Sequence, residues 1–165
     1  MNDAAQTLAT KTFAPADTPT PDIVIDEVFP HAPDVVWKAL TSGALIGRWM
    51  MEPRGFAPEM GNRFYFQTPP DGDWDGAIQC QILELIPNSR LVYTWCSGHD
   101  SPSGYVVRLD TVVSWTLAPV DGGTRVSLIH SGFVTPRNDA ILPNIKAGWP
   151  KVIGKLAVLL SDGIT

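Results

Sequence analysis

The sequence predicts an α+β domain in which a curved antiparallel sheet wraps around one long helix. From residue 61 to 133, apolar side chains largely alternate with polar ones, the period of two that is typical of strands. Residues 145–160 instead place apolar side chains three and four positions apart, as an amphipathic helix does. Consecutive strands with short turns form an antiparallel meander, which needs one face covered. The C-terminal helix is the natural cover.

The N-terminal part of this domain contains one strand and two helices. A strand is expected at 22–29, where apolar side chains again alternate with polar ones. Pro33 and Asp34 open a helix, because proline fits the first turn and an acidic side chain complements the helix dipole. The break at Thr41-Ser42-Gly43 separates it from a second, short helix that ends before Pro53.

Five strands and a long helix complete the predicted order. Asp121-Gly122-Gly123 indicates a tight hairpin between the last two strands. In the final helix, Pro150 either causes a kink or begins the regular part, since proline cannot donate to the helix ladder. The expected strands cover 61–68, 73–86, 91–95, 105–118 and 124–133.

Length and composition indicate one acidic domain. The 165 residues fit a single domain, which we place at 22–165, and residues 1–21 have no strand or helix period and predict a disordered or loosely packed tail. The net charge of −5 argues against a general nucleic-acid binder, which needs a cationic surface. There is neither a run long enough to span a membrane nor a secretory signal, so we expect a cytoplasmic protein.

The sequence predicts neither a metal nor a cofactor. Two cysteines and three scattered histidines lack the spacing of zinc ligands. Residues 71–76 resemble the opening of a calcium-binding EF-hand loop, but the twelfth position is Ile82, where a bidentate glutamate is required. Cys80 and Cys96 should lie on opposite faces of neighbouring strands, which argues against a disulfide.

A strongly curved sheet around one helix rarely fills its own interior, and the chain has six tryptophans with which to line the gap. A mostly apolar ligand would occupy such a space. Trp49, Trp95, Trp115 and Trp149 could equally be plain core, whereas Trp37 is expected in the core and Trp74 half exposed in the acidic turn. Three cations near the expected entrance, Arg48, Arg54 and Arg63, are either solvated surface or anchors for an anionic end of the ligand. The expected cavity-lining residues are Trp49, Phe64, Phe66, Trp95, Trp115, Leu128, His130, Trp149 and Ile153.

Among the inward-facing residues, His130 has the side chain that can take the widest range of chemical roles. It is in phase with Val126 and Leu128 on strand 124–133. A lone inward histidine can be structural, contact a ligand or act as a general base, and all three roles are open. Ser131 faces the other way on a regular strand, so it cannot be the nucleophile of a pair with His130. We therefore assign no catalytic residue.

An ordered set of short motifs resembles the START-like (SRPBCC, helix-grip) superfamily, and most closely the branch related to the heat-shock-protein ATPase activators. The resemblance covers about residues 22–161. It implies a β-α-α-β5-α helix-grip fold with an internal cavity. The motifs are Val36-Trp37-Lys38-Ala39-Leu40-Thr41, Leu45-Ile46-Gly47-Arg48-Trp49, Gly76 with Ile82 to Pro87, Leu91-Val92-Tyr93-Thr94-Trp95, Gly123-Thr124-Arg125-Val126, His130-Ser131-Gly132-Phe133 and Gly148-Trp149-Pro150.

Members of this superfamily bind lipids, sterols, polyketides and other hydrophobic molecules, and some are enzymes or contact chaperones. The resemblance therefore implies a bacterial-type binding module for a hydrophobic or aromatic small molecule. One alternative is an enzyme that uses His130 as an acid or base on a bound ligand. Another is an interaction protein, either a chaperone-associated domain or a homodimer formed through an exposed sheet edge. Fold alone does not choose among them.

Overall fold

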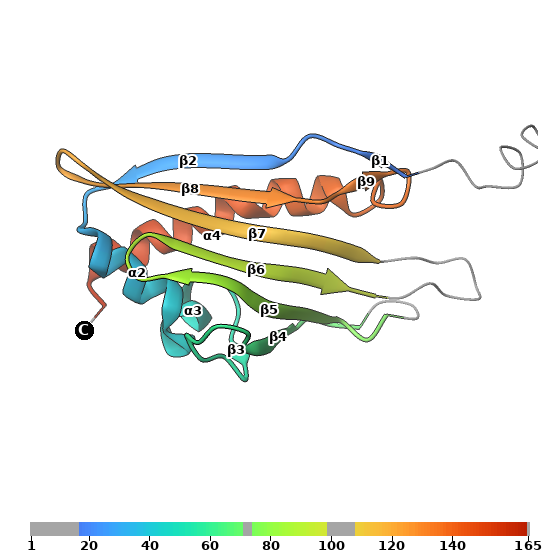
Figure 1. The fold of residues 1–165 in the computed structure, drawn as a ribbon, viewed down its shortest axis with the longest axis horizontal. Helices are drawn as coiled ribbons and strands as arrows, with labels where there is room; N and C mark the ends of the chain where they lie inside the picture. The colour runs from blue at the N-terminus through green and yellow to red at the C-terminus, as the bar shows by residue number, and fades with distance from the viewer. Residues whose placement is uncertain (1–16, 71–73, 99–107, 165) are drawn as a thin grey trace, which may run out of the picture.

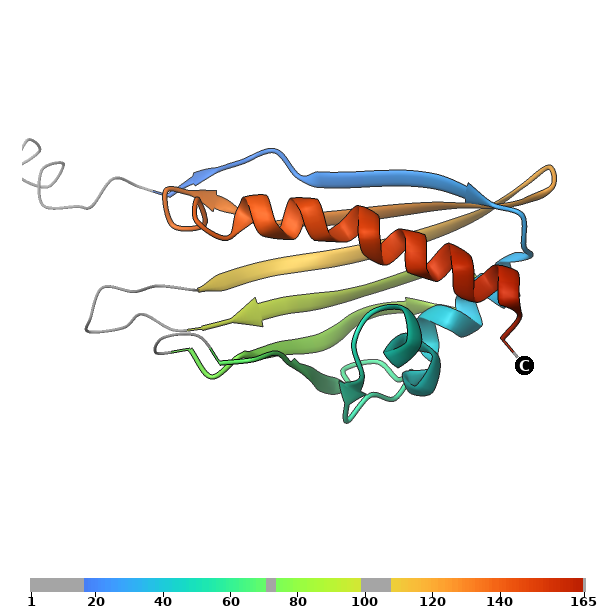
Figure 2. The same ribbon diagram turned by 180° about the vertical axis from the view of Figure 1, so that it is seen from behind.

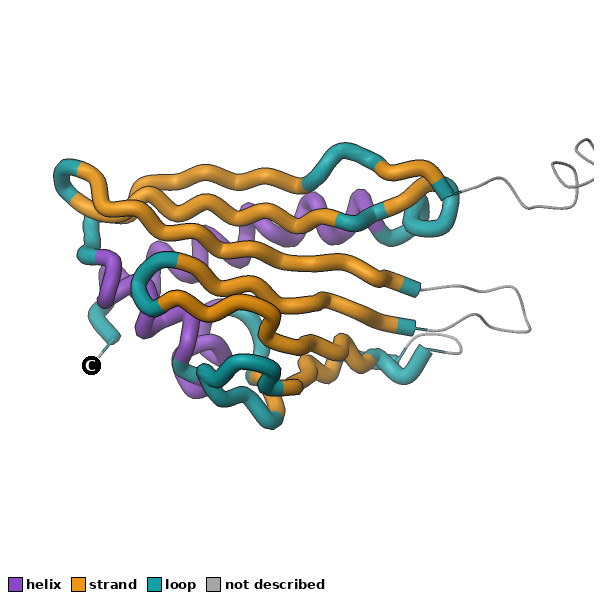
Figure 3. Tube along the Cα trace, in the orientation of Figure 1, coloured by secondary structure: helices purple, strands orange, loops and turns teal. Residues whose placement is uncertain are grey.

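The computed structural model describes residues 17–70, 74–98 and 108–164. One large antiparallel sheet has its helices on a single face (Figures 1 and 3). This arrangement confirms the predicted α+β helix-grip fold. Residues 1–16 of the predicted tail and residues 71–73 of the acidic turn lie outside the described part of the chain.

The sheet has seven strands in the order β2-β8-β7-β6-β5-β4-β3. From β3 to β8, each strand pairs with the next one along the chain, so this part is the expected meander, and β2 adds to it beside β8. The sequence pattern missed the two-residue edge strand β3, which is too short to show a period. The bounds are β2 (Ile23–Phe29), β3 (Pro53–Arg54), β4 (Arg63–Gln67), β5 (Ala77–Ile86), β6 (Arg90–Ser97), β7 (Leu109–Val120) and β8 (Gly123–Ser131).

Three helices cover one face of this sheet. They are α2 (Pro33–Thr41), α3 (Gly43–Trp49) and α4 (Leu142–Asp162). Figure 2 shows α4 crossing the sheet diagonally, with its C-terminal half beside α2 and α3. Pro150 lies inside α4, which has already begun at Leu142, so it does not start the regular helix. Because proline has no backbone N–H, one backbone hydrogen bond of α4 is absent at this position.

Part of the expected tail pairs with a segment late in the chain. Two residues of the expected tail form a short strand, β1 (Thr18–Pro19), which pairs with β9 (Val134–Thr135) in a separate two-stranded ladder. The backbone N–H of Thr20 also donates to the Phe133 carbonyl at 3.1 Å. Neither strand is long enough to show a period of two, so the pairing could not be found from the pattern.

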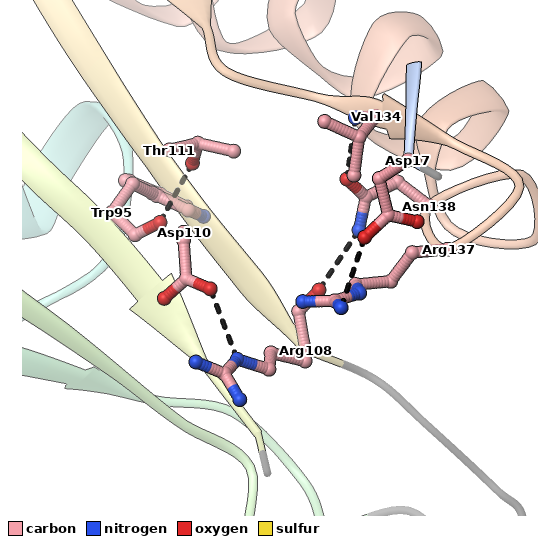
Figure 4. A network of polar contacts seen from close by, with 8 residues as sticks. All are labelled: Asp17, Trp95, Arg108, Asp110, Thr111, Val134, Arg137 and Asn138. Carbon is pink, nitrogen blue, oxygen red and sulfur yellow. Dashed lines mark hydrogen bonds and ion pairs between the residues drawn. The ribbon is translucent and has the colours of Figure 1, made fainter. Parts of the chain in front are cut away.

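Side chains hold this ladder together and join it to the residue that precedes β7 (Figure 4). Asp17 forms an ion pair with Arg137 at 2.9 Å. Asn138 is 2% exposed, and its side chain accepts from the backbone of Val134 and donates to the carbonyl of Arg108, both at 2.8 Å. These contacts attach residues 17–20 to the segment that follows β8.

The two cysteines are free, as predicted. Cys96 pairs across the ladder with Gln79, which places the buried Cys80 on the opposite face of the sheet. A register shift between Ile82 and Glu84 changes which residues pair but leaves the two thiols on opposite faces.

The hairpin between β7 and β8 provides the first prediction. Gly122 has a φ of +81° in open surroundings, whereas a Cβ on Gly123 would overlap the carbonyl oxygen of Phe29 and lie 2.9 Å from its carbon. Backbone atoms cannot easily move away, so we expect Gly123→Ala to lower the free energy of unfolding by about 1–3 kcal/mol. Gly122→Ala should cost less, because it meets only the left-handed φ penalty. Urea denaturation of both variants measures this, and an equal or smaller loss for Gly123→Ala would contradict the packing argument.

Candidate functional site

The structure brings together all nine predicted cavity residues. Each is buried, at 7% exposure or less. The strand residues are inward because they alternate with exposed or half-buried neighbours, and the two residues from α4 lie on its buried face. The set comprises Trp49 at the end of α3, Phe64 and Phe66 on β4, Trp95 on β6, Trp115 on β7, Leu128 and His130 on β8, and Trp149 and Ile153 on α4.

The aromatic rings of this set pack against one another. Trp49 and Trp115 meet edge to face with ring centres 5.6 Å apart, and Trp149 lies 5.8 Å from Trp95 and 5.9 Å from Trp115. Such distances and tilts are those that aromatic pairs prefer. The space enclosed between α2, α3 and strands β4, β6 and β7 is only about 10 Å³. That is close to the room needed by one water molecule, so the rings here act as core.

The indole N–H groups of Trp49 and Trp115 are also hydrogen-bonded. The Trp49 indole N–H donates to the Ala39 carbonyl at 2.9 Å, which ties the end of α3 to α2. The Trp115 indole N–H donates to the Tyr93 hydroxyl at 3.0 Å. Burial raises the pKa of Tyr93 above its usual range, so the hydroxyl stays neutral.

His130 sits between α4 and the sheet with both ring nitrogens engaged. The Trp149 indole N–H donates to Nδ1 at 3.0 Å, so Nδ1 carries a lone pair and the proton is on Nε2. Nε2 lies 2.8 Å from Thr111 Oγ1. That hydroxyl donates to the Trp95 carbonyl at 2.6 Å (Figure 4). Each donor therefore has an acceptor, and the network links α4, β8, β7 and β6.

This environment supports the structural role among the three that were open for His130. The side chain is fully buried, and burial lowers its pKa from 6.5 to about 3. Its only lone pair is occupied by Trp149. A general base near neutral pH needs both a free lone pair and a higher pKa.

An apolar pocket of about 140 Å³ lies at the surface beside this network. It opens between the segment that follows α3 and the N-terminal half of α4. Of the predicted cavity residues, only Trp95 and Trp149 line it. The sequence analysis missed the other walls, although the pair Met50-Met51 directly after a helix is an apolar signal. The complete lining is Met50, Met51, Trp95, Ile145, Gly148, Trp149 and Val152.

The three predicted arginine anchors lie apart from this pocket. Arg54 is exposed on the edge strand β3, and Arg63 is exposed on its neighbour β4. Arg48 is exposed in the last turn of α3 and lines a different opening, against the C-terminal half of α4. No charged side chain lines the apolar pocket among the residues described.

Residues 30–161 match the model of the family described as "Activator of Hsp90 ATPase homolog 1-like protein". The chain belongs to this family. Membership confirms the resemblance seen in the short motifs. No curated protein gives a match.

Solved structures of relatives share the same fold. The protein MLL2253 from Mesorhizobium loti is 34% identical, with a TM-score of 0.74 over 88% of this chain and all of that one. CalU16 from Micromonospora echinospora is 24% identical, with a TM-score of 0.64 over 86% of this chain and 80% of its own. The Aha1 dimer from Colwellia psychrerythraea is 19% identical, with a TM-score of 0.64 over 84% and 94%.

Two further findings concern membranes and metals. Within residues 17–70, 74–98 and 108–164, no helix combines the length and apolar character needed to cross a bilayer. The same ranges contain no group of three or more His, Cys, Asp or Glu side chains arranged to hold a metal ion.

Burial of His130 predicts a specific pH dependence of stability. As the pH falls below about 6.5, the unfolded chain binds a proton at this site while the folded protein does not, so stability is lost until the pH nears 3. The loss should approach about 1.4 kcal/mol per pH unit. His130→Gln removes this titration, so its urea-denaturation free energy should fall less than that of the wild type between about pH 6.5 and 4.5.

Leu128→Ala is the matched control, because it weakens the same strand without removing a titratable group. It should keep the wild-type slope. The same slope in His130→Gln as in the wild type would show that His130 does not titrate as its surroundings imply.

Proposed function

We propose that this domain binds a small hydrophobic molecule and seats a ring-sized apolar group in the pocket between Met50-Met51 and α4. The observation that carries the proposal is the apolar pocket itself, whose walls hold two tryptophans and no titratable side chain. Its volume of about 140 Å³ is close to that of an engineered apolar cavity of about 150 Å³ that stays dry and binds benzene. The proposed ligand is therefore an aromatic or compact aliphatic group.

The walls of the pocket suit this role in two different ways. Trp149 is fixed by its hydrogen bond to His130, and Trp95 is held against both Trp149 and Phe66. A rigid wall binds without losing side-chain freedom. Met50 and Met51 are only partly buried, and their unbranched side chains can adapt to ligands of different shape. A larger ligand would enter by moving these methionines.

Nothing comparable to the apolar pocket supports a role in acid–base catalysis. The pocket lining has no group that could move a proton, and the lone pair of His130 is bound to Trp149. The family description names an activator of Hsp90, and the Colwellia relative is a dimer, but neither name identifies the residues of this chain that would form such a contact. Binding without chemistry is the function that the geometry favours.

Gly148 offers a direct test of the pocket. It lies on the lining, and a Cβ placed on it would meet nothing within 4 Å. Gly148→Leu should therefore fill the pocket while improving the intrinsic stability of α4 by up to about 1 kcal/mol. Bromobenzene should quench wild-type tryptophan fluorescence saturably, with a dissociation constant on the order of 1 mM or lower. The Gly148→Leu variant should bind at least about tenfold more weakly, a difference of about 1.4 kcal/mol.

Gly154→Leu is the matched control, since Gly154 lies in the same helix, also has open space around it and does not line the apolar pocket. It should quench like the wild type. Absence of saturable quenching in the wild type, or wild-type quenching in Gly148→Leu, would reject this pocket as the binding site. Circular dichroism melts confirm that each variant is folded.

A further inference from the structure

A second opening lies on another face of α4. It is a groove of about 520 Å³ between the last turn of α3 and the C-terminal half of α4, the region where the two helices lie side by side in Figure 2. We name it the basic groove because three of its seven lining residues are cations. The lining is Arg48, Lys151, Gly154, Lys155, Val158, Leu159 and Asp162.

We propose that the basic groove binds an organic anion that carries an apolar body. This site shares no lining residue with the apolar pocket, so it does not depend on the function proposed above. The proposal has three supports: the pairing of the cations, their position on the helices, and the apolar floor between them.

The cations of the groove have no acidic partner among the described residues. Ion pairs are formed instead by other arginines, for example Arg90 with Glu84 and Arg125 with Asp26. The whole chain has a net charge of −5, so carboxylates are plentiful elsewhere on the protein. The one carboxylate in the lining, Asp162, leaves an excess of positive charge. An anion bound there would find donors that are not already committed.

Helix stability does not account for these positions. A cation in the last turn of α3 complements the helix dipole, which explains Arg48. Lys151 and Lys155 lie well inside α4, away from either end. They are four residues apart on one face, a spacing at which like charges destabilise a helix by about 0.2–0.5 kcal/mol. A bound anion would turn this repulsion into attraction.

The floor of the groove indicates what the anion is attached to. Val158 is 59% exposed, and Leu159 beside it is buried. An alkyl or aryl body lying over these side chains would remove apolar surface from water. A carboxylate or phosphate at one end would meet Arg48, Lys151 and Lys155. The ligand class is therefore an amphipathic carboxylate or phosphate monoester.

Octyl phosphate and octanoate are suitable probes, with octanol as the neutral analogue and inorganic phosphate as the head group alone. Titration calorimetry of the full chain should show binding of one or both amphipathic anions, weaker binding of phosphate and no binding of octanol. The affinity should fall as salt is added, because exposed charges are screened. Comparing the two anions decides whether the head group is a phosphate or a carboxylate.

The double variant Lys151→Gln/Lys155→Gln should weaken binding of the preferred anion by about fivefold or more, since each exposed charge contributes modestly. Lys146→Gln is the matched control. Lys146 is exposed on the same helix but does not line the groove, so its removal should leave the affinity unchanged.

Several results would overturn the proposal. Binding of octanol as tight as that of the anions would assign the interaction to apolar contact alone. Equal losses in the double variant and in Lys146→Gln would show a general charge effect. Cosedimentation with phosphatidylglycerol vesicles, lost in the double variant and without binding of either soluble anion, would identify a membrane surface as the partner instead.

Discussion

The position of α4 depends on its contacts with the sheet, because the helix is intrinsically weak. Two glycines and a proline lie inside it, and relative to alanine these residues cost roughly 5 kcal/mol of helix propensity. Its buried face, from Trp149 to Leu160, compensates by packing on the core. The hydrogen bond from Trp149 to His130 adds a directional link to β8. Both proposed sites have α4 as a wall, so both depend on this attachment.

Alternation in the sequence was sufficient to find which side chains face inward. It placed Trp95, Trp115, Leu128 and His130 on the inner face, and the structure confirms their burial. Alternation cannot reveal whether inward side chains surround a space or fill it, since that depends on sheet curvature and ring tilt. The edge-to-face contact of Trp49 with Trp115 is such a detail, and it closes the interior at that level.

The features that the sequence analysis missed are short or arise from distant segments. The β1–β9 ladder joins residues more than a hundred positions apart, and each strand has only two residues. Met50 and Met51 form a pocket wall only because α4 passes beside them. The partners of His130, Thr111 and Trp149, likewise come from different elements. The inward direction of His130 was predictable from the sequence, but the hydrogen bonding of both its ring nitrogens was not.

The two glycines of α4 connect the weakness of this helix to its openings. Gly148 lines the apolar pocket and Gly154 lines the basic groove, and neither would place a Cβ within 4 Å of another atom. Close packing therefore does not demand glycine at either position, although each costs the helix about 1 kcal/mol relative to alanine. A side chain at either position would instead occupy an opening. The stability forgone at these two sites is the physical cost of keeping both faces of α4 accessible.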